Sequence, residues 1–232
     1  MSLPYTSYQI EPGFWCIEEC GVRCFLFEGD DEALLIDAGF GTGDLKDYIS
    51  TLTVAPVKRL VITHADRDHI GCAYQFDQIL MHPAEFERYA ASGKNSAKLF
   101  SLWENSELSI GQWNLSVILL PGHTPGSIAL LEREHKFLIA GDCVQATPIY
   151  MFGQGRNLPA FIHSIDRLTA LSSSFDTIYA SHGKLVLSTE ILPLLKEGAQ
   201  QVLSGNLVGN PLPREMPCLH YQWDQVGFLY DN

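Results

Sequence analysis

Short apolar runs separated by turn residues make up the first part of the chain. Three such runs, residues 14–18, 24–28 and 33–37, are divided by turns that each contain glycine, the second as Gly29-Asp30-Asp31. A short run of aromatic and branched side chains, bounded by turn residues, is typical of a β-strand. The pattern therefore predicts that the chain opens with antiparallel strands.

Helical spacing then alternates with strand-like runs. Apolar side chains in residues 42–52 recur at intervals of three and four, which predicts a helix. Residues 58–63 form an apolar run, residues 70–78 a helical pattern and residues 79–82 another apolar run, which together predict a β-α-β unit. Residues 83–106 are predicted to be mostly helical.

The second half of the chain repeats the order of strands followed by β-α units. Strands are predicted at 115–122, 127–132, 136–142 and 177–183, helices at 158–171 and 188–203, and a closing hairpin from two alternating runs at 218–223 and 226–231. The order as a whole predicts two sheets packed face to face with helices outside. We expect a single domain over residues 1–232, with residues 205–232 as a C-terminal extension.

Composition and charge narrow the class of protein. With 232 residues, of which 46% are hydrophobic, the chain is long enough for one well-packed domain. A net charge of −12 disfavours binding to phosphate backbones and anionic membranes, so neither nucleic acid nor a membrane is an expected partner. No run reaches the roughly 18 apolar residues of a membrane helix, and the first residues lack a signal-peptide pattern. We expect a cytoplasmic protein that acts on a small molecule, in an oligomeric state that the sequence leaves open.

The six cysteines point to packing rather than to a framework of disulfides. Cys16, Cys20 and Cys24 lie four residues apart, unlike the paired C-x-x-C spacing of zinc knuckles, and a core of this size does not need covalent links. We expect buried free thiols in strands.

Four polar clusters each follow an apolar strand candidate: VITHADRDH, VILLPGHTPGS, FLIAGD and TIYASHG. Loops beyond strand ends often carry ligands and catalytic groups on a rigid scaffold. The side chains that we expect to converge are His64, Asp66, Asp68, His69, His123, Asp142 and His182. Imidazoles with carboxylates form a ligand set that suits zinc, iron or manganese.

Each of these residues has a simpler explanation when taken alone. A single His or Asp at a strand end more often caps a loop than binds a metal, and only the number of such residues favours a shared site. Asp37 is expected to cap a turn and to orient a ligand side chain. Thr124 and Ser127 either form hydrogen bonds behind the ligands or cap the turn that follows His123. The remaining histidines are interpreted as structural: His82, His135, His163 and His220.

The clusters resemble the ordered motifs of the metallo-β-lactamase superfamily. THADRDHIG resembles its H-x-H-x-D-H motif, LLPGHTPGSIALL, FLIAGD and YASHG resemble its third to fifth motifs, and ALLIDAGFG is similar to its first. The resemblance spans nearly the whole chain. It implies an α+β fold, the four-layer αββα sandwich of this superfamily, and a centre with two divalent transition metal ions, zinc first, with manganese or iron as alternatives.

Carried over to this chain, the motifs imply a ligand for each position of a two-metal centre. The first metal receives His64, Asp66 and His123, the second receives Asp68, His69 and His182, and Asp142 lies between them. Asp66 departs from the motif, because most members have His there. Asp142 stands where the zinc β-lactamases have Cys, so antibiotic hydrolysis is not the first expectation.

The resemblance and the ligand set predict a hydrolase that uses a metal-bound hydroxide on a small ester, thioester or lactone. Asp68, next to His69, is the candidate acid/base and orienting residue. The segment 148–168 is similar to the pocket loop of hydroxyacylglutathione hydrolases and supplies two substrate-binding candidates, Tyr150 and Arg156. Tyr150 is a potential donor to an oxyanion, with packing as the alternative.

Three other functions remain as alternatives on the same fold. A metal-dependent phosphodiesterase or nuclease requires basic groups near its site, and the chain has 15 Lys and Arg against 27 Asp and Glu. A diiron redox protein would need an electron-donating partner domain. A non-catalytic metal-binding protein would be expected to have lost ligands, whereas here one ligand is replaced by another ligand type.

Overall fold

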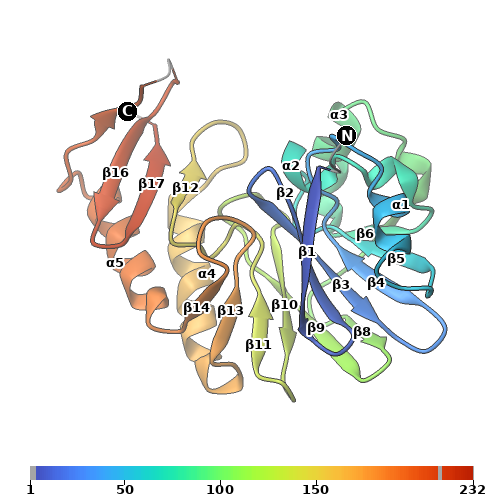
Figure 1. The fold of residues 1–232 in the computed structure, drawn as a ribbon. Helices are drawn as coiled ribbons and strands as arrows, with labels where there is room; N and C mark the ends of the chain where they lie inside the picture. The colour runs from blue at the N-terminus through green and yellow to red at the C-terminus, as the bar shows by residue number, and fades with distance from the viewer. Residues whose placement is uncertain (1–3, 214–215, 232) are drawn as a thin grey trace. The chain divides into compact units, whose positions relative to one another are not determined.

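The computed structural model describes residues 4–213 and 216–231. Within them, the chain combines α-helices with several β-sheets. It divides into two compact units, Met1–Val117 and Ile118–Asn232, each with its own hydrophobic core. We call them unit 1 and unit 2 (Figure 1).

Unit 1 is built on a seven-stranded sheet whose strand order follows chain order. The first four strands pair antiparallel, and the sheet continues in parallel from the fourth to the seventh. The strands are β1 (Tyr5–Glu11), β2 (Phe14–Glu19), β3 (Val22–Glu28), β4 (Ala33–Ile36), β5 (Val57–Val61), β6 (Ile79–Met81) and β7 (Leu99–Ser101). Because β4 and β5 are parallel neighbours, the loops that follow them leave the sheet at the same edge.

Short helices connect the strands of unit 1. They are α1 (Leu45–Ser50), α2 (Arg67–Ile70) and α3 (Phe86–Ala91), with 3-10 turns η1 (Ala73–Gln75), η2 (Pro83–Glu85) and η3 (Ser96–Lys98). Helix α1 begins where Asp44 caps it, accepting a hydrogen bond from the backbone N of Asp47 at 2.9 Å. It buries Leu45 and Ile49 in the core of unit 1, so one apolar face holds the helix in place.

A hairpin completes the described part of unit 1. Strand β8 (Glu107–Ile110) pairs antiparallel with β9 (Trp113–Leu119), whose last residues enter unit 2. The buried ring of Trp113 lies 5.7 Å from that of Phe14 and 5.5 Å from that of Phe27. These edge-to-face contacts stabilise the hairpin against β2 and β3.

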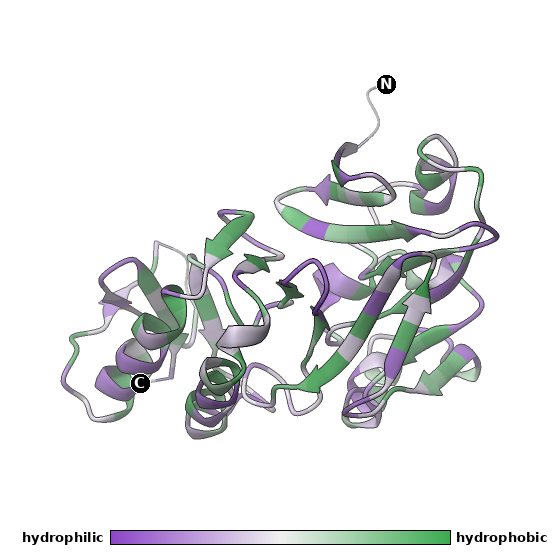
Figure 2. Ribbon diagram, turned by 90° about the horizontal axis from the view of Figure 1, so that it is seen from below, coloured by the Kyte–Doolittle hydropathy of each residue, from purple (hydrophilic) through white to green (hydrophobic). Residues whose placement is uncertain are grey.

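Unit 2 contains four further strands hydrogen-bonded in the order β14-β13-β11-β10. They are β10 (Ile128–Glu132), β11 (Phe137–Ile139), β13 (Thr177–Tyr179) and β14 (Val186–Ser188). Every residue of β10 and β11 is buried, which is typical of strands covered on both faces. Figure 2 shows hydrophobic residues concentrated along strands and mixed colouring on helices, as expected for helices with one buried face.

A second sheet and two long helices complete unit 2. The sheet has the order β12-β17-β16-β15, with β12 (Pro148–Met151), β15 (Asn210–Pro211), β16 (Leu219–Trp223) and β17 (Val226–Tyr230). The helices are α4 (Leu158–Ala170) and α5 (Ile191–Leu203), and η4 (Ser172–Ser174) is a 3-10 turn. Strands β16 and β17 form an antiparallel hairpin, and β12 pairs in parallel with β17. The single-domain organisation stays a prediction, and residues 1–3, 214–215 and 232 of it lie outside the described residues.

Most of the predicted strands are present with ends displaced by a few residues, but two helical predictions were wrong. Residues 70–78 are not one helix: α2 ends at Ile70, and the 3-10 turn η1 follows at Ala73–Gln75. In a continued α2, the backbone N–H groups of Gly71 and Cys72 would donate to residues 67 and 68, but they donate to Gly39 and Ala38 at 2.7 and 2.8 Å. The segment 83–106 is helical only in part: α3 ends before Gly93, whose φ is +79°, and β7 pairs in parallel with β6. The sequence analysis also did not predict β1, β8, β12, β14 and β15.

Candidate functional site

In unit 1, the predicted ligands follow the end of the parallel strand β5. His64 lies three residues beyond β5, Asp66 caps α2 without a side-chain bond to the helix, and Asp68 and His69 lie within α2. Because α2 has only four residues, the chain reverses sharply here. The turn brings the imidazole rings of His64 and His69 to 4.1 Å between centroids.

Asp37, at the end of the neighbouring strand β4, holds this loop together. Its buried carboxylate accepts hydrogen bonds from the backbone N and from Oγ1 of Thr63, both at 2.8 Å. It also lies 2.8 Å from Nδ1 of His69. The residue has φ +62°, a conformation that Asp adopts more readily than most side chains. Asp37 therefore orients a predicted ligand, as the sequence analysis expected.

These contacts determine which ring nitrogen of each histidine faces the carboxylates. Nδ1 of His64 lies 3.1 Å from Oγ1 of Thr63, and Nδ1 of His69 is taken by Asp37. Nε2 of His64 lies 3.6 Å from Oδ2 of Asp66, and Nε2 of His69 lies 3.7 Å from Oδ2 of Asp68. Anchoring through Nδ1 leaves the Nε2 lone pair for a metal, the usual arrangement of ligating histidines.

Unit 2 contributes a second group of predicted ligands, each following a buried strand. His123 comes after β9, Asp142 after β11 and His182 after β13. Nε2 of His123 lies 3.6 Å from Oδ2 of Asp142, and Nε2 of His182 lies 3.4 Å from Oδ1 of the same carboxylate. Asp142 thus lies between two imidazoles, with one oxygen toward each.

The donor atoms of each group have the spacing of atoms that share a cation. Ligand bonds of about 2.0–2.1 Å around a tetrahedral ion put neighbouring donors roughly 3.3–3.4 Å apart. The nitrogen–oxygen distances of 3.4–3.7 Å in the two groups come close to that value. Nitrogen with carboxylate oxygen is also a donor set that transition metals accept. The residues present therefore fit the metal ions that the sequence motifs implied.

The residues around His123 hold its loop. Nδ1 of His123 lies 2.9 Å from the backbone carbonyl of Tyr150 on β12, and the guanidinium of Arg156 donates to the carbonyl of His123. Thr124 and Ser127 hydrogen-bond to each other, with Oγ1 and Oγ at 2.6 Å, which matches the turn-capping alternative. Arg156 and the backbone of Tyr150 thus brace a predicted ligand, and their roles toward a substrate stay predictions.

The histidines interpreted as structural have local contacts in two cases. His82 caps η2 by accepting a hydrogen bond from the backbone N of Ala84 at 3.3 Å, and Nδ1 of His135 lies 3.1 Å from Oε2 of Glu132. His163 lies on α4 and His220 on β16.

The sequence analysis missed two residues that hold the His64 loop. Glu85 is buried and accepts a hydrogen bond from the backbone N of Ala65 at 2.9 Å. Arg88 donates to Oδ1 of Asp66 at 2.8 Å. The one signal in the sequence is their i, i+3 spacing in EFER, which places both on one face of a helix.

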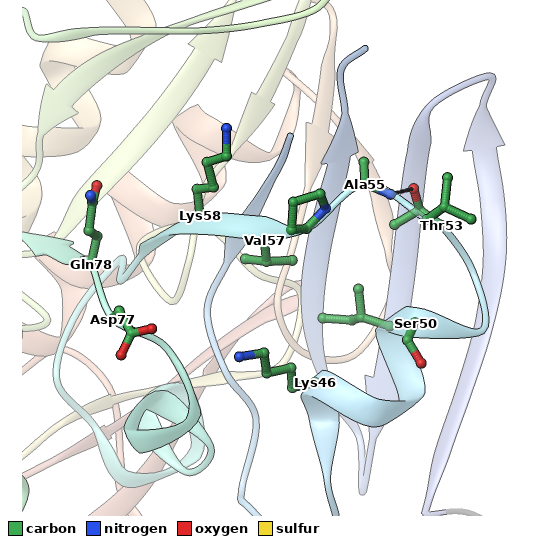
Figure 3. A pocket seen from close by; sticks show the side chains of 11 residues that line it. Lys46, Ser50, Thr53, Ala55, Val57, Lys58, Asp77 and Gln78 are labelled. Atoms are coloured by element: carbon green, nitrogen blue, oxygen red, sulfur yellow. Dashed lines mark hydrogen bonds between the residues drawn. The ribbon is translucent and has the colours of Figure 1, made fainter. Parts of the chain in front are cut away.

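A pocket of about 430 Å³ on unit 1 lies away from the predicted ligands (Figure 3). Its lining includes Val57 and Lys58 at the start of β5, whereas His64 follows the end of that strand. The carboxylate of Asp77, which also lines the pocket, lies 2.7 Å from Nζ of Lys98. This ion pair holds the pKa of Asp77 below its usual value. The lining mixes aliphatic and polar side chains and contains no histidine, so the pocket does not resemble a metal centre.

The sequence model of the family described as "Metallo-beta-lactamase superfamily" matches residues 17–182. The chain is 30% identical over 199 residues to the acyl-coenzyme A thioesterase MBLAC2 of Gallus gallus, covering 68% of this chain and 72% of the relative. It is 28% identical over 176 residues to the same enzyme of Homo sapiens, covering 56% and 63%. It is also 28% identical over 159 residues to the hydroxyacylglutathione hydrolase GloC of Haemophilus influenzae, covering 60% and 69%. The chain thus spans less than two thirds of the human relative.

Solved structures agree on the fold. A metallo-beta-lactamase from Pontibacter korlensis matches with a TM-score of 0.73 and 21% identity, covering 84% of this chain and 99% of that one. A metallo-beta-lactamase family protein from Thermus thermophilus matches with a TM-score of 0.69 and 21% identity, covering 85% and 83%. The predicted α+β fold of the metallo-β-lactamase type is confirmed.

The relatives bear names of hydrolases, and the prediction of an enzyme of the metallo-hydrolase class is confirmed. Within the described residues, no helix is long and apolar enough to span a membrane, as the sequence predicted. Because the family match covers residues 17–182, well over half of the chain, this protein belongs to the metallo-beta-lactamase superfamily.

Proposed function

We propose that the protein hydrolyses small acyl thioesters with the help of two divalent metal ions, for which zinc is the first candidate. The ligands are those that the motif resemblance implies: His64, Asp66 and His123 for the first ion, Asp68, His69 and His182 for the second, and Asp142 for both. The family match supports the proposal, because it runs through both units. The names of the thioesterase and hydroxyacylglutathione hydrolase relatives favour a thioester among the small carbonyl substrates.

The observation that carries the proposal is the same anchoring of a histidine in both units. Nδ1 of His69 lies 2.8 Å from a carboxylate, and Nδ1 of His123 lies 2.9 Å from a backbone carbonyl. In each case Nε2 faces a carboxylate, Asp68 or Asp142, at 3.7 or 3.6 Å. A histidine that only fills a core does not need such an oxygen acceptor behind it and a carboxylate in front of it.

The bound ions would lower the pKa of a coordinated water and polarise the thioester carbonyl. The chain's own residues would then orient and move protons. The carboxylate of Asp68, whose side chain is 22% exposed, is accessible enough to accept a proton from water and to pass it to the sulfur of the departing thiolate, which leaves as the thiol. Asp37 would keep the ring of His69 in a single orientation while this happens.

The apolar part of the substrate has a candidate place in unit 2. The half-exposed side chain of Tyr150 lines a pocket of about 220 Å³ together with Leu212, Pro213, Met216 and Leu229. The backbone carbonyl of Tyr150 lies 2.9 Å from Nδ1 of His123, so one residue both lines the pocket and contacts a predicted ligand. We propose that the acyl chain lies there, which keeps Tyr150 as a substrate-binding residue. Arg156 remains a substrate-binding candidate through its position behind His123.

The expected partner is therefore a small molecule in the cytoplasm, and nucleic acid and membranes are not expected partners. The net charge of −12 supports this part of the proposal.

The test is thiol release from a series of acyl thioesters by the purified protein. We expect turnover that a chelator abolishes and added zinc restores, because no nucleophilic side chain is needed when water is activated. The variant Asp68→Asn should lose most of the activity, on the order of 100-fold or more. Hydrolysis that survives complete removal of metal would contradict the proposal. Activity on a phosphodiester with none on thioesters would favour the nuclease class instead.

A further inference from the structure

Asp66 is the one predicted ligand that departs from the H-x-H-x-D-H pattern, and the structure surrounds it in an unexpected way. Arg88, on α3, reaches Oδ1 of Asp66 with two nitrogens, Nε at 2.8 Å and Nη2 at 2.7 Å. The Asp66 side chain is 16% exposed and the Arg88 side chain 35%, so this ion pair is partly buried. A partly buried pair held by two nitrogens is much less screened than an ordinary surface pair.

The two oxygens of Asp66 have different neighbours. Oδ1 faces the guanidinium, and Oδ2 lies 3.6 Å from Nε2 of His64. Because two nitrogens of Arg88 contact one oxygen, rotation of the carboxylate would break both contacts together. Arg88 thus holds Oδ2 on the side of His64.

The segment that carries Arg88 also fixes the backbone beside Asp66. Glu85, one turn earlier on the same side of the η2–α3 segment, accepts the backbone N–H of Ala65 at 2.9 Å. Two side chains spaced i, i+3 therefore hold two consecutive residues of the loop. A loop residue anchored at both backbone and side chain is well suited to present a ligand atom.

The net charge of the Asp66–Arg88 pair equals that of a neutral histidine. A neutral imidazole contributes no net charge to a metal centre, whereas an aspartate contributes one negative charge. The guanidinium of Arg88 carries one positive charge at any physiological pH, so the sum over Asp66 and Arg88 is zero. The Asp66–Arg88 pair therefore contributes the same net charge as the neutral histidine that the motif has in place of Asp66.

We propose that Asp66 and Arg88 act as one unit: Asp66 supplies the ligand oxygen, and Arg88 is the positioning residue that aims it and cancels its charge. The inference rests on the proposed function, since it assumes that a metal binds at His64 and Asp66. It assigns a metal-site role to a residue outside the sequence motifs. An oxygen donor at this position also favours harder ions, such as Mn²⁺, more than an imidazole does.

The experiment is a double-variant cycle read by metal binding alone. The variants are Arg88→Met, which keeps the length of the side chain without its charge, Asp66→His, and the two combined. Arg67→Met is the matched control, because Arg67 is an exposed arginine next to Asp66. Metal content after dialysis, affinity by competition with a chromogenic chelator, and the ratio of bound Zn²⁺ to Mn²⁺ are measured for each.

We expect Arg88→Met to lower the affinity for one of the two metal ions by 10- to 100-fold. Arg67→Met should bind both ions with the affinity of the parent protein. Asp66→His alone should bind that metal poorly, because the guanidinium then faces an imidazole and a cation. The combined variant should recover binding to within a few-fold of the parent and should prefer zinc more strongly. Equal binding by Arg88→Met and Arg67→Met, or strictly additive effects in the cycle, would overturn the proposal.

Two further measurements separate this inference from other failures. If the parent protein binds no metal, the proposed function is overturned. If the parent protein binds two metal ions and Arg88→Met does not change their affinity, only the proposed role of the Asp66–Arg88 pair is overturned. If Arg88→Met does not fold, Arg88→Lys keeps the charge with a single nitrogen and should retain intermediate affinity. The melting temperatures of the metal-free variants show any loss of stability that is purely structural. The rise in melting temperature on adding zinc must, in addition, be smaller for Arg88→Met than for the parent protein.

Discussion

Asp37 shows how a single residue determines what its neighbours can do. Its carboxylate contacts the backbone and hydroxyl of Thr63 and the ring of His69, and Thr63 in turn contacts His64. One buried acid therefore sets the orientation of two predicted metal ligands. Such supporting contacts matter nearly as much as the ligands themselves.

Replacing Asp37 with Asn should weaken metal binding while the fold survives. An amide oxygen can still accept from the backbone of Thr63, but it does not stabilise the ring of His69 as a carboxylate does. We expect metal affinity to fall on the order of 10- to 100-fold, measured by chelator competition. His135→Asn, which removes a ring bonded to Glu132 in unit 2, is the control and should leave affinity unchanged. No loss in Asp37→Asn would show that the ring of His69 is held by other contacts.

At the scale of elements, glycines let helices and loops approach one another where a ligand is presented. Gly122 immediately precedes His123 and has φ +145°. Its carbonyl accepts the backbone N–H of Asn157 at 2.8 Å, at the start of α4. A Cβ on Gly122 would lie 2.5 Å from the backbone of Phe161. The loop therefore lies directly against the first turn of α4.

Gly122→Ala is expected to destabilise unit 2, because the added methyl group meets helix backbone and the residue must hold a positive φ. The loss should be about 2 kcal/mol or more of unfolding free energy. Gly205→Ala is the comparison, since Gly205 has φ +70° but nothing within 4 Å of the added Cβ. It should cost about 1 kcal/mol. Urea titration of both variants measures the difference, and equal losses would mean that the α4 contact yields without strain.

At the scale of the whole molecule, groups that resist ionisation gather in unit 1. Burial raises the pKa of Cys16 to about 11 and that of Cys24 well above its usual value. Burial also raises the pKa of Tyr5, whose hydroxyl lies 3.5 Å from Sγ of Cys72. The sequence analysis expected buried free thiols; five of the six are buried, and Cys20 is exposed. Each of these groups favours the folded state only while it is protonated.

Alkaline pH should therefore destabilise unit 1 before unit 2. A folded pKa raised above the unfolded value gives stability that is complete below the unfolded pKa and is lost as pH rises through the folded pKa. For Cys16 the window runs from pH 9.0 to about 11, and the shift corresponds to roughly 2–3 kcal/mol. Thiol labelling read by mass spectrometry should show Cys16 and Cys24 reacting at pH 10.5 before Cys143 in unit 2. In Cys16→Val, the urea midpoint of unfolding should depend less on pH over this window. The same pH dependence as in the parent protein would contradict the assignment to Cys16.

Several features of this protein were readable from the sequence because they depend on local order along the chain. Alternating apolar runs and turn residues predicted most strands, and the four polar clusters at strand ends predicted where His64, Asp142 and the other candidate ligands would lie. These patterns hold because a strand buried on both faces is a nearly continuous apolar run, so polar side chains concentrate in the loop that follows it. The resemblance of the motifs to those of the metallo-β-lactamase superfamily predicted the fold, because the motifs are also local in the sequence.

Other features were decided only by tertiary structure, because they depend on partners distant in the chain. Residues 70–78 read as a helix, but α2 ends at Ile70, where the backbone N–H groups of Gly71 and Cys72 donate to Gly39 and Ala38 instead of continuing that helix. Residues 99–101 read as helical, but pairing with β6 made them a strand. The charge at Asp66 reads as one negative unit in the sequence, and only the fold brings Arg88, 22 residues later, within 2.8 Å of it. Local propensity is worth less than one kcal/mol per residue, whereas a hydrogen bond or ion pair buried by the fold outweighs it.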